Sequence, residues 1–234
     1  MRHSRIMFMG WLLVVMALAA PQVTAQGNPR ITVFGGGSFL SASRSFTVNG
    51  QNFDTRFVNG GKLRLRGSLD LTSHWTLEGD YSFGRNNFRV DELGATPQQR
   101  DFGVRLHGIN FNLVRFWTSS NSRFRPYLTT GLGLSRFSPT DVAKTLAINN
   151  ALFDAPASLA TSNTFGFPLG GGAEIRLSRW FGTRLEVKDY ISAVPRFGVS
   201  KTSSGAGGTF FPVTGIAHNV EAAVGIVFYL TPRK

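Results

Sequence analysis

The segment KLRLRGSLDL, residues 62–71, alternates between apolar and polar side chains along most of its length. Leucine occupies positions 63, 65, 69 and 71, and charged or small polar residues fill most of the positions between them. Because successive side chains of a β-strand point to opposite faces, this pattern predicts a strand with one apolar face and one charged face. In a soluble protein the leucines would face the core, whereas in a membrane barrel they would face lipid and the charges would face the lumen.

The amino terminus has the pattern of a secretory signal peptide. Two arginines precede an apolar run at residues 6–20, and a small-residue site ends at Ala25. The run is shorter than the roughly 20 residues that a membrane-spanning helix needs. We therefore expect a signal peptide at residues 1–25 and one β-barrel domain at residues 26–234. The chain contains no cysteine, so it offers neither a disulfide framework nor a cysteine lipid anchor.

Alternating apolar segments recur throughout the rest of the chain and predict eight strands. Three of the predicted connections are short, near residues 73–74, 118–124 and 178–180, whereas the other four are long and rich in Gly, Asn, Ser and Pro. Short and long connections alternate strictly, as in bacterial outer-membrane barrels with tight periplasmic turns and long extracellular loops. The predicted strands lie near residues 30–43, 58–72, 75–89, 101–117, 125–137, 164–177, 181–197 and 217–230.

This pattern predicts an all-β fold, an eight-stranded antiparallel up-and-down transmembrane β-barrel. The fourth predicted strand departs from a clean alternation, because its apolar residues at 102, 104 and 106 are in one phase and those at 109, 111 and 113 are in the other. A β-bulge inserts one extra residue into a strand and would account for such a change of phase. We therefore expect a bulge near Gly108.

The faces predicted to point inward carry nearly balanced charge, with seven basic and six acidic residues. A solvated face has no need of such balance, whereas an unpaired ion inside a narrow barrel costs several kcal/mol. The balance therefore favours a lumen filled by paired charges. The basic residues are Lys62, Arg64, Arg66, Arg105, Arg176, Arg184 and Lys188, and the acidic residues are Asp70, Glu78, Asp80, Glu174, Glu186 and Glu221.

Three tryptophans stand beside the three short turns, at Trp75, Trp117 and Trp180. Tryptophan is enriched where a membrane protein crosses the interface between lipid and water. This placement favours an aromatic belt at the periplasmic side of the predicted barrel.

Four stretches of the chain resemble the outer-membrane protein A-like family of small eight-stranded transmembrane barrels. They are RPYLTTGLGL at 125–134, FGFPLGGGAEIRLS at 165–178, TRLEVKDY at 183–190 and AVGIVFYL at 223–230. With the strand order and the signal peptide, the resemblance covers essentially the whole chain after residue 25. It implies a monomeric barrel whose lumen holds a charged network, and the matching positions here are Glu174, Arg176, Arg184, Glu186 and Lys188.

Two departures from that family bear on function. Many members continue into a peptidoglycan-binding domain, and this sequence stops after its last predicted strand, so we expect no cell-wall tether. The family's final strand usually ends on an aromatic residue that the barrel-assembly machinery recognises, whereas here four residues follow Leu230. Phe228 or Tyr229 would take that role.

We expect no enzymatic activity and neither a cofactor nor a metal site. His74 falls in a predicted turn, His107 is expected in the lumen and His218 begins the last strand, and none has a serine two residues away on the same face. A serine on a neighbouring strand can still approach one of these histidines, so a barrel enzyme that modifies lipid A stays an alternative. The chain has no HExxH motif and no pair of histidines at metal-ligand spacing.

The formal net charge of the whole chain is +12, and most of this excess falls outside the predicted lumen. For an exported chain such charge favours an anionic membrane surface over nucleic acid. Basic residues at the extracellular rim would meet lipopolysaccharide phosphates, with solubilising loop charges as the alternative. A second group, including Arg30 and Arg125, would meet phospholipid headgroups at the periplasmic end. The candidate lipopolysaccharide contacts are Arg85, Arg89, Arg100 and Arg136.

The longest predicted loop, residues 138–163, is rich in Ala and Leu and is expected to form a short amphipathic helix or turn over the barrel mouth, to contact a partner, or to be disordered. Eight strands enclose a lumen that side chains can fill, so a diffusion pore is disfavoured. We expect a structural or surface-interaction protein of a Gram-negative outer membrane. The alternatives are a narrow gated channel and the lipid A-modifying enzyme.

Overall fold

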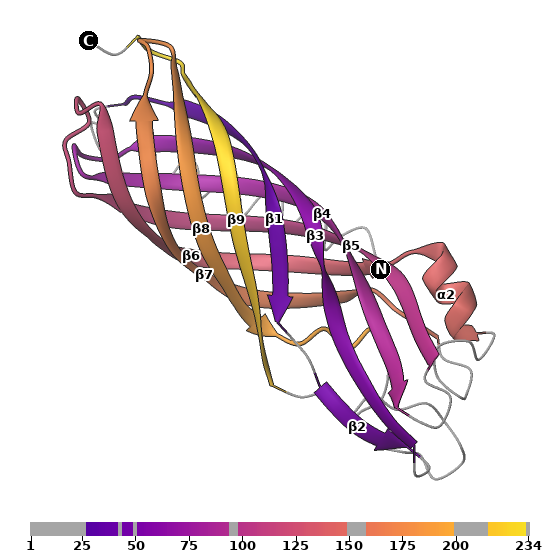
Figure 1. The fold of residues 1–234 in the computed structure, drawn as a ribbon. Coiled ribbons are helices and arrows are strands. Elements are labelled where there is room, and N and C mark those ends of the chain that lie inside the picture. The colour runs from indigo at the N-terminus through magenta and orange to yellow at the C-terminus, as the bar shows by residue number, and fades with distance from the viewer. Residues whose placement is uncertain are drawn as a thin grey trace, which may run out of the picture.

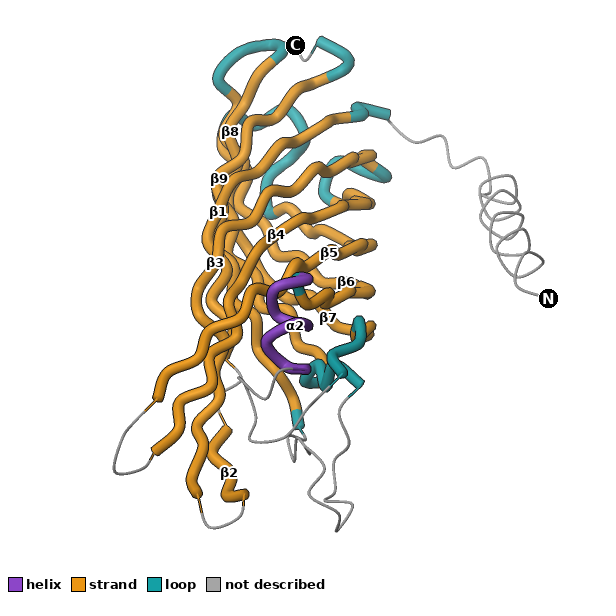
Figure 2. Tube along the Cα trace, turned by 90° about the vertical axis from the view of Figure 1, so that its right-hand side faces the viewer, coloured by secondary structure: helices purple, strands orange, loops and turns teal. Residues whose placement is uncertain are grey.

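The computed structural model describes residues 27–41, 44–48, 51–93, 98–148, 158–198 and 215–232. These residues form a closed barrel of eight antiparallel strands, with one further short strand and one short helix (Figures 1 and 2). The predicted fold class is therefore confirmed. The predicted signal peptide lies outside the described residues.

The barrel strands follow one another around the ring in the order β1, β9, β8, β7, β6, β5, β4, β3, and the ring closes where β1 pairs with β3. That closing ladder runs from Arg30 opposite Ser68 to Ser38 opposite Gly60. The strands are β1 (Arg30–Ser41), β2 (Arg44–Val48), β3 (Gln51–Asp70), β4 (Trp75–Leu93), β5 (Gln98–Phe116), β6 (Phe124–Pro139), β7 (Ser162–Arg176), β8 (Phe181–Ala193) and β9 (Ile216–Tyr229).

The two ends of the barrel differ. The three connections predicted to be short are turns at one end, at 71–74, 117–123 and 177–180, while β2 and the helix lie at the other end (Figure 2). Strands β3, β4 and β5 extend beyond their predicted bounds toward that second end (Figure 1). A register shift between Val58 and Gly61 separates the part of β3 in the ring from the part that continues outward and pairs with β2.

Alternate residues of the barrel strands face the lumen and the outside. In β3, every second residue from Lys62 to Asp70 is buried. Between them, Leu63 and Leu65 expose 64% and 54% of their surface. The leucines therefore form part of an apolar outer wall, and the charges point into the lumen, as a membrane barrel requires.

The bulge expected near Gly108 is wrong. Strand β5 pairs with both β4 and β6 through this position without a shift of register. Phe102, Val104 and Leu106 keep the inward phase and are each at most 3% exposed. The change of phase in the sequence reflects a change in the lining of the lumen from polar to apolar, and not an extra residue in the strand.

Helix α2 (Asp141–Ile148) forms in the longest loop, where a short helix was one of the expected structures. It buries Ala143 and Ala147 and contacts β5. In the described part of the chain, no helix is long and apolar enough to cross a membrane.

Candidate functional site

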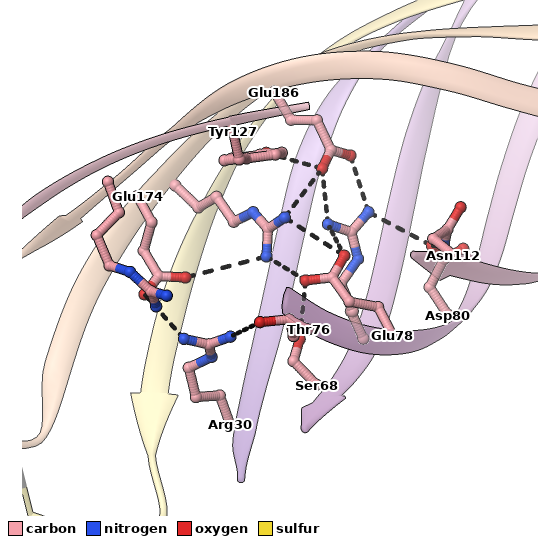
Figure 3. A network of polar contacts seen from close by, with 12 residues as sticks. Arg30, Ser68, Thr76, Glu78, Asp80, Asn112, Tyr127, Glu174 and Glu186 are labelled. Carbon is pink, nitrogen blue, oxygen red and sulfur yellow. Dashed lines mark hydrogen bonds and ion pairs between the residues drawn. The ribbon is translucent and has the colours of Figure 1, made fainter. Parts of the chain in front are cut away.

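The middle of the lumen holds a network of buried charges (Figure 3). Among the described residues it contains seven cations and six anions, each 9% exposed or less. The numbers of cations and anions equal the predicted numbers, but two of the seven cations are different residues from the predicted ones. The members are Arg30, Lys62, Arg64, Arg66, Arg125, Arg184 and Lys188, with Asp70, Glu78, Asp80, Glu174, Glu186 and Glu221.

Glu186 of β8 is the centre of this network. The guanidinium of Arg66 on β3 donates to both of its oxygens, at 2.6 and 2.8 Å, in the bidentate arrangement that arginine makes best. Arg64 donates from Nη1 at 2.5 Å, and the Tyr127 hydroxyl donates at 2.9 Å. The Nζ of Lys188 lies 3.6 Å away. One buried carboxylate thus compensates charges from two strands, β3 and β8, that are not neighbours in the ring.

A second pair spans the lumen. Arg184 of β8 donates to Glu78 of β4 through both terminal nitrogens, at 2.5 and 3.3 Å. Strands β4 and β8 are four places apart in either direction around the ring, so they lie on opposite walls. Arg66 also reaches Glu78, at 3.1 Å. These contacts occupy the cross-section through which a solute would have to pass.

The end of the lumen near the short turns is closed by a mixture of ions and rings. Arg30 pairs with Asp70 at 2.7 Å and with Glu174 at 3.2 Å. The guanidinium carbon of Arg125 lies 3.7 Å from the centroid of the Phe116 ring, within the range of a cation–π contact. Arg30 and Arg125 are each 1% exposed, so the expectation that they face phospholipid headgroups is wrong. Each occupies the inward phase of its strand.

Nearer the other end, two smaller polar groups complete the network. The amide nitrogens of Asn110 and Asn112 donate to Asp80 at 2.7 and 2.9 Å. Lys62 forms an ion pair with Glu221. The ammonium of Lys62 also lies 4.6 Å from the ring centroid of Tyr190, where the polar lining gives way to an apolar one.

Two of the predicted lumen cations lie elsewhere. Arg105 is exposed on the outer wall, because β5 keeps its register through Gly108. Arg176 is half-buried at the end of β7, and its Nη2 donates to the carbonyl of Asn121 at 2.8 Å. Arg30 and Arg125 are the two buried cations of the lumen that were not predicted. The sequence could have indicated Arg125, because it lies two residues before Tyr127 and therefore on the same, buried face of β6.

A glycine makes room for an aromatic ring inside the network. Phe34 is 1% exposed, and the guanidinium carbons of Arg64 and Arg66 lie 4.8 and 4.6 Å from its ring centroid. A Cβ at Gly225 would come within 2.6 Å of that ring. Glycine at this position therefore permits the ring to support two of the guanidiniums that converge on Glu186.

Past Lys62, toward the end that carries α2, the buried residues are mostly apolar. Phe102 and Phe197 contact each other edge to face, with ring centroids 6.2 Å apart. The segments that close this end are joined by a hydrogen bond of 2.7 Å from the amide of Ala160 to the carbonyl of Phe197. The larger apolar or aromatic residues buried there are Leu40, Phe102, Val104, Leu106, Phe137, Leu159, Tyr190, Val194 and Phe197.

The three histidines that could serve catalysis have separate partners. His107 hydrogen-bonds to Tyr81 at 2.7 Å on the outer wall, so its expected place in the lumen is wrong. His218 contacts Asp189 at 2.6 Å, and His74 contacts Ser73 at 2.8 Å. Within the described ranges, no histidine contacts both a serine and a carboxylate, the combination that a hydrolytic triad uses. The described residues also contain no cluster of three potential metal ligands.

The candidate lipopolysaccharide contacts have different environments. Arg85 and Arg136 are exposed on the outer wall. Arg89 is half-buried, and the side chain of Arg100 lies outside the described part of the chain. All three tryptophans beside the short turns are exposed, with Trp75 at 36%, Trp117 at 57% and Trp180 at 50%.

A closed barrel with an apolar outer wall, exposed tryptophans at one end and a charged lumen defines the class of outer-membrane β-barrel proteins. The family model of the outer membrane protein beta-barrel domain matches residues 11–210. The chain belongs to this family, and the family's location is the outer membrane of Gram-negative bacteria.

Solved structures share the fold at low sequence identity. OprG from Pseudomonas aeruginosa is 14% identical, with a TM-score of 0.55 over 88% of this chain and 98% of that one. The outer membrane protein AlkL is 13% identical, with a TM-score of 0.50 over 92% of this chain and 96% of that one. A search of curated protein sequences finds no match to this chain.

Proposed function

We propose that this protein is a structural and surface-interaction barrel of the outer membrane and that it does not conduct solutes through its lumen. The observation that carries the proposal is the ion pair between Glu78 and Arg184, which joins opposite walls of the barrel. At eight strands the interior has room for side chains and little else. A lumen filled in this way gives the barrel rigidity and leaves function to its outer surfaces.

Both ends of the lumen support the proposal. Near the short turns, Val114, Phe116 and Tyr127 form a buried apolar cluster, each at most 1% exposed. At the opposite end Phe102 and Phe197 pack edge to face among other buried apolar residues. A solute would have to displace three successive layers of packed side chains.

The interaction surface would be the end that carries β2 and α2. Strands β3, β4 and β5 project there beyond the closed ring (Figure 1), and β2 pairs with β3 outside the β1–β3 ladder. Projecting strands and loops on a rigid scaffold are where binding surfaces concentrate. We propose that the partner of this surface lies outside the cell. We also propose that residues 1–25 are the signal peptide that directs export of the chain. A single copy closes the barrel, in keeping with a monomer.

For recognition by the barrel-assembly machinery, Phe228 is the better of the two candidate aromatics. Its side chain is 37% exposed on the outer wall, where it contacts Phe181 edge to face. Tyr229 is 3% exposed, and its hydroxyl donates to Glu174 inside the barrel. An outward aromatic at the end of the last strand is accessible to another protein during assembly, whereas an inward one is committed to the lumen.

Planar-bilayer conductance of the purified, folded protein tests the proposal. A filled lumen gives no stable open level, whereas a reproducible open level would identify the gated channel instead. Heat-modifiable migration on a gel verifies that the sample contains folded barrel. Mass spectrometry of lipid A from cells that express the protein addresses the enzyme alternative, since a change of lipid A mass would overturn a purely structural role.

A further inference from the structure

Three arginines form a row on the outer wall across β4, β5 and β6. Arg85 on β4 stands directly opposite Arg105 on β5. On β6, Arg136 stands opposite His107, which places it diagonally beside Arg105. All three side chains are exposed. Directly opposed residues of an antiparallel pair have Cβ atoms roughly 5 Å apart, so the guanidiniums of this arginine row can share one anion.

Among the residues whose side chains the structure describes, no carboxylate forms an ion pair with Arg85, Arg105 or Arg136. Like charges directly opposite each other destabilise a sheet, and this arrangement is therefore costly unless an anion lies between them. The wall formed by β8 and β9 is different, because there Asp189 has His218 as its partner at 2.6 Å. The described residues therefore place this uncompensated cluster of three arginines on the side of the rim formed by β4, β5 and β6.

The height of the arginine row corresponds to the outer leaflet. Below it on the same face lie Phe83, His107 and Leu134, and β4 begins at Trp75, ten residues before Arg85. Ten residues at ~3.3 Å each, along a strand tilted by ~40°, rise ~25 Å, which is the height of the apolar band of such barrels. Since Trp75 marks the periplasmic interface, Arg85 lies at the level of the opposite headgroups.

A groove of about 460 Å³ begins beside Arg85 on the outer wall. Its lining is almost entirely apolar and includes Gly35, Gly61, Leu63 and Phe83. Gly35, Gly61 and Leu63 are exposed, so the groove opens toward lipid. Gly35 and Gly61 have no side chains to fill this groove, so its volume is free to hold part of a hydrocarbon chain next to Arg85.

We propose that these features bind one lipid A molecule of the outer leaflet, with a phosphate held between Arg85 and Arg105, Arg136 as a further contact, and one acyl chain in the groove. The proposal rests on the function given above, a barrel of the outer membrane. Arginine suits the phosphate because its planar fork donates two parallel hydrogen bonds to oxyanions. Lipid A supplies phosphate and acyl chain in a single molecule at this depth.

The headgroup part is tested with the Arg85→Gln/Arg105→Gln double variant. Wild type and variant are folded into phosphatidylcholine nanodiscs, and binding of purified bisphosphorylated lipid A is titrated by native mass spectrometry. We expect affinity to fall about tenfold or more, because charge-assisted hydrogen bonds are lost. Arg115→Gln is the matched control, since this exposed arginine of β5 lies near Trp75 at the other interface. Equal affinity of wild type and double variant would overturn the proposal.

The lipid probes separate phosphate chemistry from lipid identity. Dephosphorylated lipid A should bind wild type about as weakly as bisphosphorylated lipid A binds the double variant. Phosphatidylglycerol carries a phosphate without the acylated disaccharide, and it should compete weakly. Competition as strong as that of lipid A itself would show a generic anionic-lipid site and would contradict the assignment to lipid A.

The acyl-chain part is tested with Gly35→Leu, which fills the groove. A Cβ at Gly35 meets no atom within 4 Å, so the barrel can accept the change. Gly67→Leu is the control, because Gly67 is also outward and equally free of neighbours but does not line the groove. We expect several-fold weaker lipid A binding for the first variant only, and equal binding would remove the groove from the site. Heat-modifiable migration on a gel verifies that each variant is folded. Conductance of the same variants is measured separately, so a failure of lipid A binding can be distinguished from a lumen that conducts.

Discussion

Two neighbouring tiers of the lumen are filled by different means. The charged tier contains the thirteen buried ions centred on Glu186. The apolar tier, toward the end with α2, contains Phe102, Val104, Leu106 and their buried neighbours. The same strands enclose both tiers, and the side chains of both are buried. Their difference shows that a narrow barrel can be closed either by matching charges or by matching volumes.

The two solutions respond differently to mutation. In the charged tier each ion is desolvated, so the stability of the barrel there depends on which partner each ion has. In the apolar tier the contacts are non-directional, so stability depends on how well the space is filled. An isosteric substitution is therefore expected to be costly in the first tier and cheap in the second.

Glu186→Gln should have the largest effect on the stability of the barrel. The change preserves volume but leaves Arg64, Arg66 and Lys188 without their shared carboxylate. Breaking a buried pair by removal of one partner costs roughly 3–5 kcal/mol. The free energy of unfolding should fall by that amount in urea titrations of the barrel in lipid vesicles.

Asp141→Asn is the control for this experiment. It removes a pair with Lys144 in which the two side chains are 90% and 45% exposed. An exposed pair of this kind contributes at most about 1 kcal/mol, so the unfolding curve should hardly move. If both substitutions had the same effect, the charged tier would not depend on pairing.

Much of the charged tier could be predicted from the sequence, because alternation in the strands separates an inward set from an outward one. All six buried carboxylates were in the predicted set, since each stands between apolar outward residues. Arg30 was not, because it stands at the start of its strand, where few neighbours establish a phase. Which ions would pair across the lumen depends on the order of strands around the ring, and no local pattern contains that information.

The apolar tier was not predictable in the same way. Along the charged tier, the apolar residues of a strand point outward. This rule fails for Phe102 and Leu106, because the lumen itself is apolar at their level. A bulge and a change of lining give the same sequence pattern. The same ambiguity concealed Arg105, whose outward position follows from the continuous register of β5.

Leu65→Arg tests the boundary between the charged tier and the membrane. Leu65 is 54% exposed on the outer wall, next to the buried Arg64 in the same strand. An arginine on the lipid face near the midplane should lower the free energy of unfolding by roughly 2–4 kcal/mol. Arg64→Leu is the companion variant, which should destabilise the network without placing charge in lipid. Unchanged folding of Leu65→Arg in bilayers would contradict the outward assignment of the leucines.

Leu106→Met should have the smallest effect and defines the apolar tier. Leu106 is 3% exposed, and methionine nearly preserves its volume. A volume-conserving substitution in an apolar core costs less than about 1.5 kcal/mol, whereas Leu106→Ala leaves a cavity and should cost roughly 2–5 kcal/mol. Urea titration in vesicles would measure both. A large loss with methionine, comparable to that of Glu186→Gln, would mean that specific contacts rather than volume hold this tier together, and the distinction between the two tiers would fail.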